Sequence, residues 1–281
     1  MRKGKSSFLL ILLLLVTSLW PQSKPPNQIR LQYYNSPSGV LILPECIWAP
    51  AGGGGTWMTE LQIAAITDVS AIYVAFCYGG GNYRGPFTLA SNVSSGEVKI
   101  WPNILEALDN IDPDNTFSYY GRVGALWIAT EDLIQEKILA LGKTNNGPYG
   151  KIVPALADID ANFCSNEPFR PMIIGGLVNN NAYRSSVGGF NMSSSPIEIT
   201  FELYDASGAM IGSPFTETFA AFDFKAFNPF NRAGVPYPNN SYDAAYLVIL
   251  PESGLGRVMF FGATASNTTN DPATILPFQL R

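Results

Sequence analysis

The chain has 281 residues, of which 47% are hydrophobic and 14% are charged, and its formal net charge is −5. This apolar content excludes a disordered chain, and the acidic balance without a basic cluster argues against nucleic-acid binding, because an acidic surface repels phosphates. The sequence contains no histidine, which excludes Ser-His-Asp and Cys-His catalysis and histidine-ligated zinc.

The first 18 residues have the three-part pattern of a secretory signal peptide. Basic residues at positions 2, 3 and 5 precede an unbroken apolar run from Phe8 to Val16, and small residues follow at 17 and 18. This run is well short of the roughly 20 residues that span a bilayer. We therefore expect cleavage after Ser18 and a secreted, periplasmic or cell-surface protein with no membrane span after cleavage. The alternative is a non-cleaved anchor.

The remainder of the chain divides into two similar halves. The strand-like segment at 72–78, followed by glycines and Gly-Pro-Phe, recurs at 199–205, followed by Ala-Ser-Gly and Ser-Pro-Phe. A repeat of this size predicts two copies of one domain. We therefore expect a lead-in segment at 19–40, a first β-sandwich repeat at 41–157, a linker at 158–168 and a second repeat at 169–281.

Both repeats have the periodicity of β-strands. Residues 72, 74 and 76 and their counterparts 199, 201 and 203 are apolar and alternate with other types, so they should face the cores. This places Cys77 and Tyr204 on the outer face. Short strands separated by Gly, Asn and Pro turns predict an all-β fold of two tandem antiparallel β-sandwich domains, immunoglobulin- or jelly-roll-like, related by internal duplication. Short helical turns are expected at 102–108 and 131–135.

The chain has three cysteines, Cys46, Cys77 and Cys164. In an oxidising compartment one pair could form a disulfide and leave one free thiol. Alignment of the two repeats pairs Cys46 with Met172 and Cys77 with Tyr204, so a disulfide is not part of the repeated design. Three unpaired, partly buried cysteines are the alternative, and the sequence leaves both open.

Aromatic residues are dense in the first repeat and give the best lead to a binding site. The candidate ligand-binding residues are Trp48, Trp57, Tyr78, Tyr83 and Trp101. Flat aromatic rings on a sandwich face can stack on sugar rings or anchor a protein partner. The competing interpretation is that these rings fill the cores and pack the two domains together.

One acidic segment has the oxygen spacing of a calcium loop. Asp158, Asp160 and Asn162 stand two residues apart, but the glycine expected at the sixth position and the glutamate at the twelfth are missing. A solvated linker is therefore the favoured interpretation, and calcium is the one cofactor that the sequence suggests. A second acidic group at 109, 112 and 114 contains Pro113, which favours a turn.

Several segments carry a family resemblance. They are Gly55-Thr56-Trp57-Met58-Thr59-Glu60-Leu61, Gly-Ala-Leu-Trp-Ile at 124–128, and an ending of Gly-Arg-Val at 256–258 with a Thr/Asn-rich loop at 263–272. Together they resemble tandem β-sandwich repeats of bacterial exported proteins of unassigned function. The second repeat departs by having Tyr183 and Ser185 where the first has Trp57 and Thr59. The resemblance implies a secreted β-sandwich repeat, often appended to enzymes or found in surface arrays, and carries no catalytic motif.

We therefore expect an exported, non-catalytic binding or structural spacer protein of the bacterial cell envelope, with a protein or a glycan as partner. One alternative is a carbohydrate-binding accessory module. A second alternative is a glycoside hydrolase, which would need two carboxylates about 5–9 Å apart, and no motif in the sequence places two carboxylates in this way.

Overall fold

A computed structural model describes residues 40–51, 54–131, 137–147, 149–157 and 163–280. These residues belong to a single unit that begins at Ser36. The expected signal peptide, the lead-in segment up to residue 39, and Asp158, Asp160 and Asn162 lie outside the described residues. The expected helical turn at 131–135 lies outside them too, apart from its first residue. The expected domain boundaries stay a prediction.

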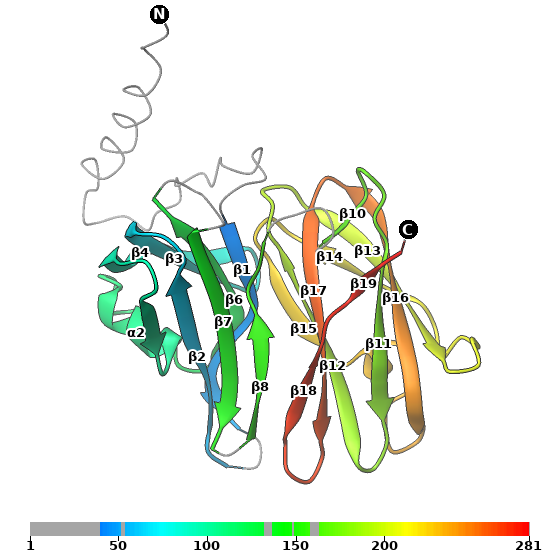
Figure 1. Ribbon diagram of the computed structural model, residues 1–281. Coiled ribbons are helices and arrows are strands. Elements are labelled where there is room, and N and C mark those ends of the chain that lie inside the picture. The colour runs from blue at the N-terminus through cyan, green and yellow to red at the C-terminus, as the bar shows by residue number, and fades with distance from the viewer. Residues whose placement is uncertain (1–39, 52–53, 132–136, 148, 158–162, 281) are drawn as a thin grey trace, which may run out of the picture. The chain divides into compact units, whose positions relative to one another are not determined.

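The described residues form antiparallel strands and two short helices (Figure 1), which confirms the predicted all-β class. The strands of the first half are β1 (Val40–Pro50), β2 (Thr56–Ala65), β3 (Val69–Tyr78), β4 (Asn82–Val93), β5 (Val98–Trp101), β6 (Arg122–Thr130), β7 (Ile138–Asn146), β8 (Tyr149–Pro154) and β9 (Leu156–Ala157). Those of the second half are β10 (Cys164–Ser165), β11 (Met172–Asn179), β12 (Tyr183–Asn191), β13 (Ile197–Asp205), β14 (Phe215–Phe219), β15 (Phe224–Phe227), β16 (Tyr242–Gly254), β17 (Arg257–Ser266), β18 (Pro272–Ile275) and β19 (Phe278–Gln279). The helices are α2 (Ile104–Ile111) and α3 (Pro229–Arg232).

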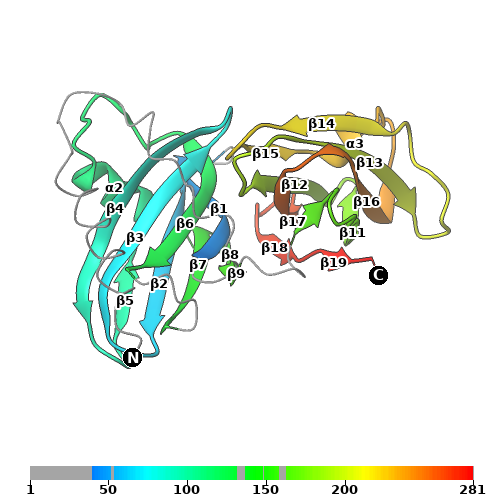
Figure 2. The same ribbon diagram turned by 90° about the horizontal axis from the view of Figure 1, so that it is seen from above.

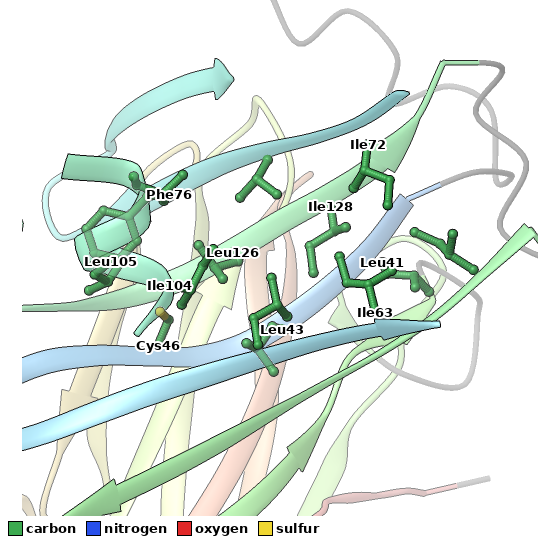
Figure 3. Packing of buried hydrophobic residues seen from close by; sticks show 14 of the residues in the cluster. Leu41, Leu43, Cys46, Ile63, Ile72, Phe76, Ile104, Leu105, Leu126 and Ile128 are labelled. Carbon is green, nitrogen blue, oxygen red and sulfur yellow. The ribbon is translucent and has the colours of Figure 1, made fainter. Parts of the chain in front are cut away.

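The first half is one hydrogen-bonded sheet that forms two layers. Its strand order is β4-β3-β6-β1-β2-β7-β8, with β5 beside β2 and β9 beside β1, and β1 pairs with β2 next to their hairpin. We call β4-β3-β6-β1-β9 sheet A1 and β5-β2-β7-β8 sheet A2. Their facing apolar sides enclose the first core, to which sheet A1 contributes Leu43 and Ile72 and sheet A2 contributes Ile63 (Figure 3). Residues 72, 74 and 76 all lie in this core, as their alternation predicted.

Helix α2 adds three side chains to this core. Ile104, Leu105 and Leu108 recur at helical spacing and are all buried. The helix begins after Asn103, whose side chain accepts a hydrogen bond from the backbone N–H of Glu106 and so satisfies one of the free donors of the first turn. The helical turn predicted at 102–108 is present, and it continues to residue 111.

The second half forms two separate antiparallel sheets (Figure 2). Sheet B has the order β10-β17-β12-β15, with β18 beside β17, and sheet C has the order β14-β13-β16-β11-β19. Their facing sides enclose a second core. In it the rings of Phe201 from sheet C and Phe260 from sheet B meet edge to face, with centroids 5.7 Å apart. Both halves are thus β-sandwiches of antiparallel strands.

The two halves have the same strand order. Sheets A1 and C read β4-β3-β6-β1-β9 and β14-β13-β16-β11-β19, and sheets A2 and B share β5-β2-β7-β8 and β15-β12-β17-β18. The registers agree as well. Leu43 of β1 lies opposite Leu126 of β6, Ile174 of β11 lies opposite Leu247 of β16, and a β-bulge follows both Leu43 and Ile174. Matched strands therefore direct matched positions to the same face.

A third set of buried apolar residues lies between the halves and belongs to neither core. The strands β1, β3 and β6 of sheet A1 contact β12, β15 and β17 of sheet B, so the outer faces of these two sheets cover each other. From sheet A1 this layer includes Ile42, Ala75, Cys77, Ala125 and Trp127, and from sheet B it includes Phe190, Phe224, Met259, Phe261 and Ala263.

The burial of Cys77 adds to what its alternation predicted. Cys77 lies outside the first core, as its alternation predicted, but it is fully buried because sheet B covers that face. Its counterpart Tyr204 on sheet C is only partly buried and stacks on Tyr246, with ring centroids 5.3 Å apart. Alternation identifies the face that a side chain occupies but not whether another sheet covers that face. Cys46, Cys77 and Cys164 are all free and buried.

Candidate functional site

A cavity of about 330 Å³ opens where strands of the two halves meet. The first half contributes Glu45 from β1, Trp57 from β2 and Lys151 from β8, and the second half contributes Arg184 from β12 and the loop residue Asn228. The cavity therefore combines one aromatic ring with two basic side chains, one carboxylate and one amide.

The carboxylate and one of the two basic groups form an ion pair in the cavity wall. The β-bulge after Leu43 places Glu45 beside Lys151, and their side chains are 11% and 6% exposed. The Lys151 ammonium also lies 5.4 Å from the centroid of the Phe261 ring. A buried charge is costly unless it is paired. Each side chain therefore compensates the charge of the other.

The second basic group, Arg184, has neutral partners. Its guanidinium donates to the backbone oxygen of Ser266 at 3.2 Å, to Asn267 Oδ1 at 3.1 Å and to Asn270 Oδ1 at 2.6 Å. These contacts hold the Thr/Asn-rich loop to β12, and none of these three partners carries a negative charge. Arg184 is also solvent-exposed, so it contributes positive potential at the rim of the cavity.

These features suit a flat ligand rich in oxygen atoms. The ring of Trp57 could stack on a sugar ring. The guanidinium of Arg184 could donate to a hydroxyl or carboxylate oxygen. The side-chain oxygen of Asn228 is already used, because it accepts hydrogen bonds from Phe230 N and Asn231 N as the N-cap of α3. Recognition by polar groups would therefore depend mainly on Arg184.

The five aromatic residues predicted as a binding set do not form one surface. Trp57 lines the cavity. Trp48 meets the Tyr120 ring edge to face at 5.3 Å, and Trp101 packs against the first core. Tyr83 contacts Phe222 of the second half, with ring centroids 6.0 Å apart. Tyr78 stacks on Phe76 with centroids 5.6 Å apart.

Arginine and aromatic side chains surround Tyr78. The Arg122 guanidinium lies 5.4 Å from the Tyr78 ring centroid and 5.2 Å from that of Phe117. The Arg84 guanidinium also lies over the Phe117 ring, 4.9 Å from its centroid. Because Arg122 is also the cross-strand partner of Trp48, the structure brings Trp48 and Tyr78 near one another.

The acidic segment at 109–114 is held by this cluster. Arg84 forms a bidentate ion pair with Asp112 at 2.7 and 2.8 Å and contacts Asp114 at 3.0 Å. The hydroxyl of Tyr119 donates to Asp112 at 2.8 Å. The hydrogen bond to Asp112 raises the pKa of Arg84 well above its ordinary value, and burial raises the pKa of Tyr119. The guanidinium of Arg84 therefore holds this acidic segment in place.

The described ranges contain no group of three or more Cys, Asp or Glu side chains placed to hold a metal ion. The calcium loop suggested at 158–162 lies outside these ranges. In the same part of the chain, no helix is long and apolar enough to cross a membrane.

Sequence reasoning missed Glu45, Lys151 and Arg184. One signal was available, because Glu45 interrupts an apolar run at 41–47 that otherwise reads as a buried strand. A charge inside such a strand indicates a buried partner. No comparable signal marks Lys151 or Arg184, which sit in strands of mixed composition.

Comparisons with known proteins find little similarity. No protein-family model and no curated protein matches the chain. Among solved structures, the chain is similar to the VP2 subviral particle of infectious bursal disease virus, with 11% identity and a TM-score of 0.20 over 87% of this chain and 72% of that one. A mutant VP2 of the same virus in T=1 particles gives 10% identity and a TM-score of 0.15 over 87% and 70%. Similarities this weak carry no argument about fold or function.

Proposed function

We propose that this chain arose by duplication of one β-sandwich domain and serves as an exported, non-catalytic binding or spacer protein of the bacterial cell envelope. One observation carries the proposal. The two halves share strand order, register and bulge position, and they are joined through a fully buried apolar layer. A rigid pair of like domains suits a protein that holds surfaces at a fixed spacing.

The buried carboxylates of the described residues support a role without chemistry. Glu45 pairs with Lys151, and Asp112 pairs with Arg84. Glu217 pairs with lysine and arginine side chains, and Asp223 accepts a backbone hydrogen bond. Carboxylates held in this way are engaged by the chain's own donors, whereas glycoside hydrolysis needs two carboxylates facing a substrate.

Export and partnership can be tested in the organism that produces the protein. We expect a C-terminally tagged full chain to be recovered from the envelope or periplasm with its N-terminus at Leu19. After cross-linking of intact cells, we expect it to be joined to a second copy of itself or to an envelope component. Fractionation, mass spectrometry of the N-terminus and cross-linking of intact cells measure these points. A cytoplasmic chain that retains Met1 would overturn the localisation, and glycan hydrolysis that depends on a single carboxylate would overturn the non-catalytic role.

A second candidate function is carbohydrate binding, favoured by Trp57 and Arg184 at the cavity. Polysaccharides in native gels should retard the wild-type chain and a Tyr183→Ala variant, but not a Trp57→Ala variant. Tyr183 is a matched control because it takes the place of Trp57 in the second half and does not line the cavity. No retardation of the wild-type chain across neutral and acidic polysaccharides would exclude this candidate.

A further inference from the structure

We propose that copies of this chain associate head to tail, with the outer face of sheet A2 of one copy docked on the outer face of sheet C of the next. The contact repeats, between copies, the packing of sheet B on sheet A1 that joins the two halves. The inference rests on the duplication and the structural role proposed above, and it identifies a second copy of the chain as the partner.

Sheet A2 holds the same place in the first half as sheet B in the second. The shared reference points are the facing pairs Thr59–Thr144 of sheet A2 and Ser185–Thr264 of sheet B. Counting along the paired strands from these points gives matched positions on the outer faces. The apolar residues Ala64, Val98, Leu139 and Leu141 of sheet A2 take the places of Phe190, Phe224, Met259 and Phe261 of sheet B.

The matched positions differ sharply in exposure. Phe190 and Met259 of sheet B are fully buried against sheet A1. On sheet A2, Leu139 is 65% exposed, Ile100 53% and Val98 52%. Val98 and Leu139 both lie opposite Ala64, one from each side, so these side chains form a continuous row across three strands. An exposed apolar patch of this kind marks an interaction surface.

Sheet C presents a second face that the described residues leave exposed. Ile173 lies opposite Val248 on one side and Phe278 on the other, and Phe278 is 72% exposed. The partly buried Tyr204 and Tyr246 stack on the same face. The matched positions of sheet A1 are the ones that sheet B covers. The outer face of sheet A2 therefore corresponds to that of sheet B, and the outer face of sheet C corresponds to that of sheet A1. These are the two kinds of face that pack together within the chain.

Side-chain size favours this pairing of faces. Within the chain, phenylalanine rings of sheet B pack over the small residues Ala75, Cys77 and Ala125 of sheet A1. At the proposed contact the sizes are reversed at two positions of β3 and β6, whereas the place of Trp127 is taken by the smaller Val248. Sheet A2 contributes Ala64, Val98 and leucines, whereas sheet C contributes the rings of Tyr204 and Tyr246 at the positions of Cys77 and Ala125. The two uncovered faces can therefore fill each other's volume.

Because the two faces differ, the contact is heterologous. Such contacts produce an open filament, or a ring if the rotation between copies closes. The test is sedimentation velocity of the full chain, exported and purified from an expression host, over a wide concentration range. We expect the wild-type chain to form dimers and longer assemblies as its concentration rises.

Two single substitutions separate the faces. Leu139→Lys blocks sheet A2 and Phe278→Lys blocks sheet C, so each variant alone should associate only at concentrations roughly tenfold or more above those that the wild-type chain needs. A mixture of the two variants keeps one intact face on each chain and should give dimers but no longer assemblies. Leu255→Lys is the matched control, because Leu255 is 63% exposed in the turn between β16 and β17, away from both faces, and this variant should assemble like the wild-type chain.

A wild-type chain that stays monomeric at all concentrations would overturn the inference. So would assembly that Leu139→Lys leaves intact, or a mixture of the two variants that forms no dimer. None of these results affects export or the absence of catalysis, so failure of this inference is distinguishable from failure of the proposed function.

Discussion

At the scale of single residues, the two halves share a hydroxyl pair, which is buried in the first half and part-buried in the second. Thr59 Oγ1 accepts a hydrogen bond from Ile47 N at 2.9 Å and lies 3.0 Å from Thr144 Oγ1. In the second half, Ser185 Oγ accepts from Val178 N at 2.7 Å and lies 2.8 Å from the hydroxyl of Thr264. In both halves the hydroxyl satisfies a backbone donor just after the bulge, where the strand ladder is interrupted.

Removal of this hydroxyl should destabilise either half. Thr59→Val keeps the volume of the side chain but removes the acceptor of the part-buried Ile47 N–H, which costs about 1 kcal/mol. Ser185→Ala should have a similar effect. Urea denaturation gives the free energy of unfolding for each variant.

A matched control is available in an exposed threonine pair. Thr200 Oγ1 lies 3.2 Å from Thr216 Oγ1 across β13 and β14, but water can replace this contact. Thr200→Val should therefore change the free energy of unfolding by less than about 0.5 kcal/mol. Equal losses for Thr59→Val and Thr200→Val would show that burial of the hydroxyl is not what matters.

The same residues show how far the sequence alone could align the halves. The alignment paired Thr59 with Ser185, and the strand registers agree. The same alignment sets Gly-Ala-Leu-Trp-Ile at 124–128 against 244–248 and so pairs Leu126 with Tyr246, whereas in the structure Leu126 takes the position of Leu247. Likewise, Cys46 takes the position of Leu177 and not that of Met172. Strand β6 is buried on both faces, so its apolar run gives no signal that fixes the register to one residue. A polar residue inside an apolar strand gives that signal at Thr59.

At the scale of elements, the strands and the sandwich class could be predicted. Which sheet faces are covered by another sheet could not. Alternation identified the core positions of β3 and β13 correctly. It could not show that sheet B covers Cys77, because small residues such as Ala75 and Ala125 occur on open and covered faces alike. The candidate site was predicted in part for the same reason. Trp57 was identified from its type. Lys151 comes near it through the pairing of β2, β7 and β8, and Arg184 only through the packing of the two halves.

The buried thiol of Cys77 can report on the layer between the halves. Burial raises its pKa from 9.0 to about 12, and the thiolate is the reactive form, so Cys77 should react very slowly with thiol reagents in the folded protein. Phe261→Ala removes a ring that stacks on Phe224 in this layer. We expect this variant to raise the labelling rate of Cys77 at least about tenfold while Cys46 and Cys164, inside the two cores, stay protected. Mass spectrometry of labelled peptides measures each cysteine separately.

Phe215→Ala is the control for this experiment. It deletes a ring of the same size that stacks on Phe201 in the second core and does not belong to the layer between the halves. If Phe215→Ala exposed Cys77 to the same extent, labelling would reflect global unfolding and the layer would have no separate stability.

At the scale of the whole molecule, four sheets enclose three buried layers. Sheets A2 and A1 enclose the first core, A1 and B the layer between the halves, and B and C the second core. Sheets A1 and B lie in the interior of this series and are apolar on both faces. This agrees with the low share of charged residues in the chain, which is 14%. The series of sheets also explains why Cys77 is buried although it lies outside both sandwich cores.

This extensive burial makes stability sensitive to alkaline pH. Burial raises the pKa of Cys46, Cys77 and Cys164, to about 12 for Cys77, above the ordinary value of 9.0. In the unfolded chain these thiols lose their protons near pH 9, whereas in the folded chain they keep them. The unfolded state therefore binds fewer protons above pH 9, and the free energy of unfolding should fall as pH rises from 9 towards 12, by up to roughly 1.4 kcal/mol per pH unit for each thiol.

Denaturation with urea at pH 8, 9, 10 and 11 in the presence of a reductant measures this slope. Lysine and tyrosine side chains also titrate in this range, so the informative quantity is the difference between variants. Cys77→Ala should reduce the slope by about a third of the thiol contribution, and a variant in which all three cysteines are replaced by alanine should lose that contribution entirely. If the wild-type chain and the triple variant lost stability equally between pH 9 and 11, the thiols would not be shielded from ionisation, and the burial of Cys77 between the two halves would be contradicted.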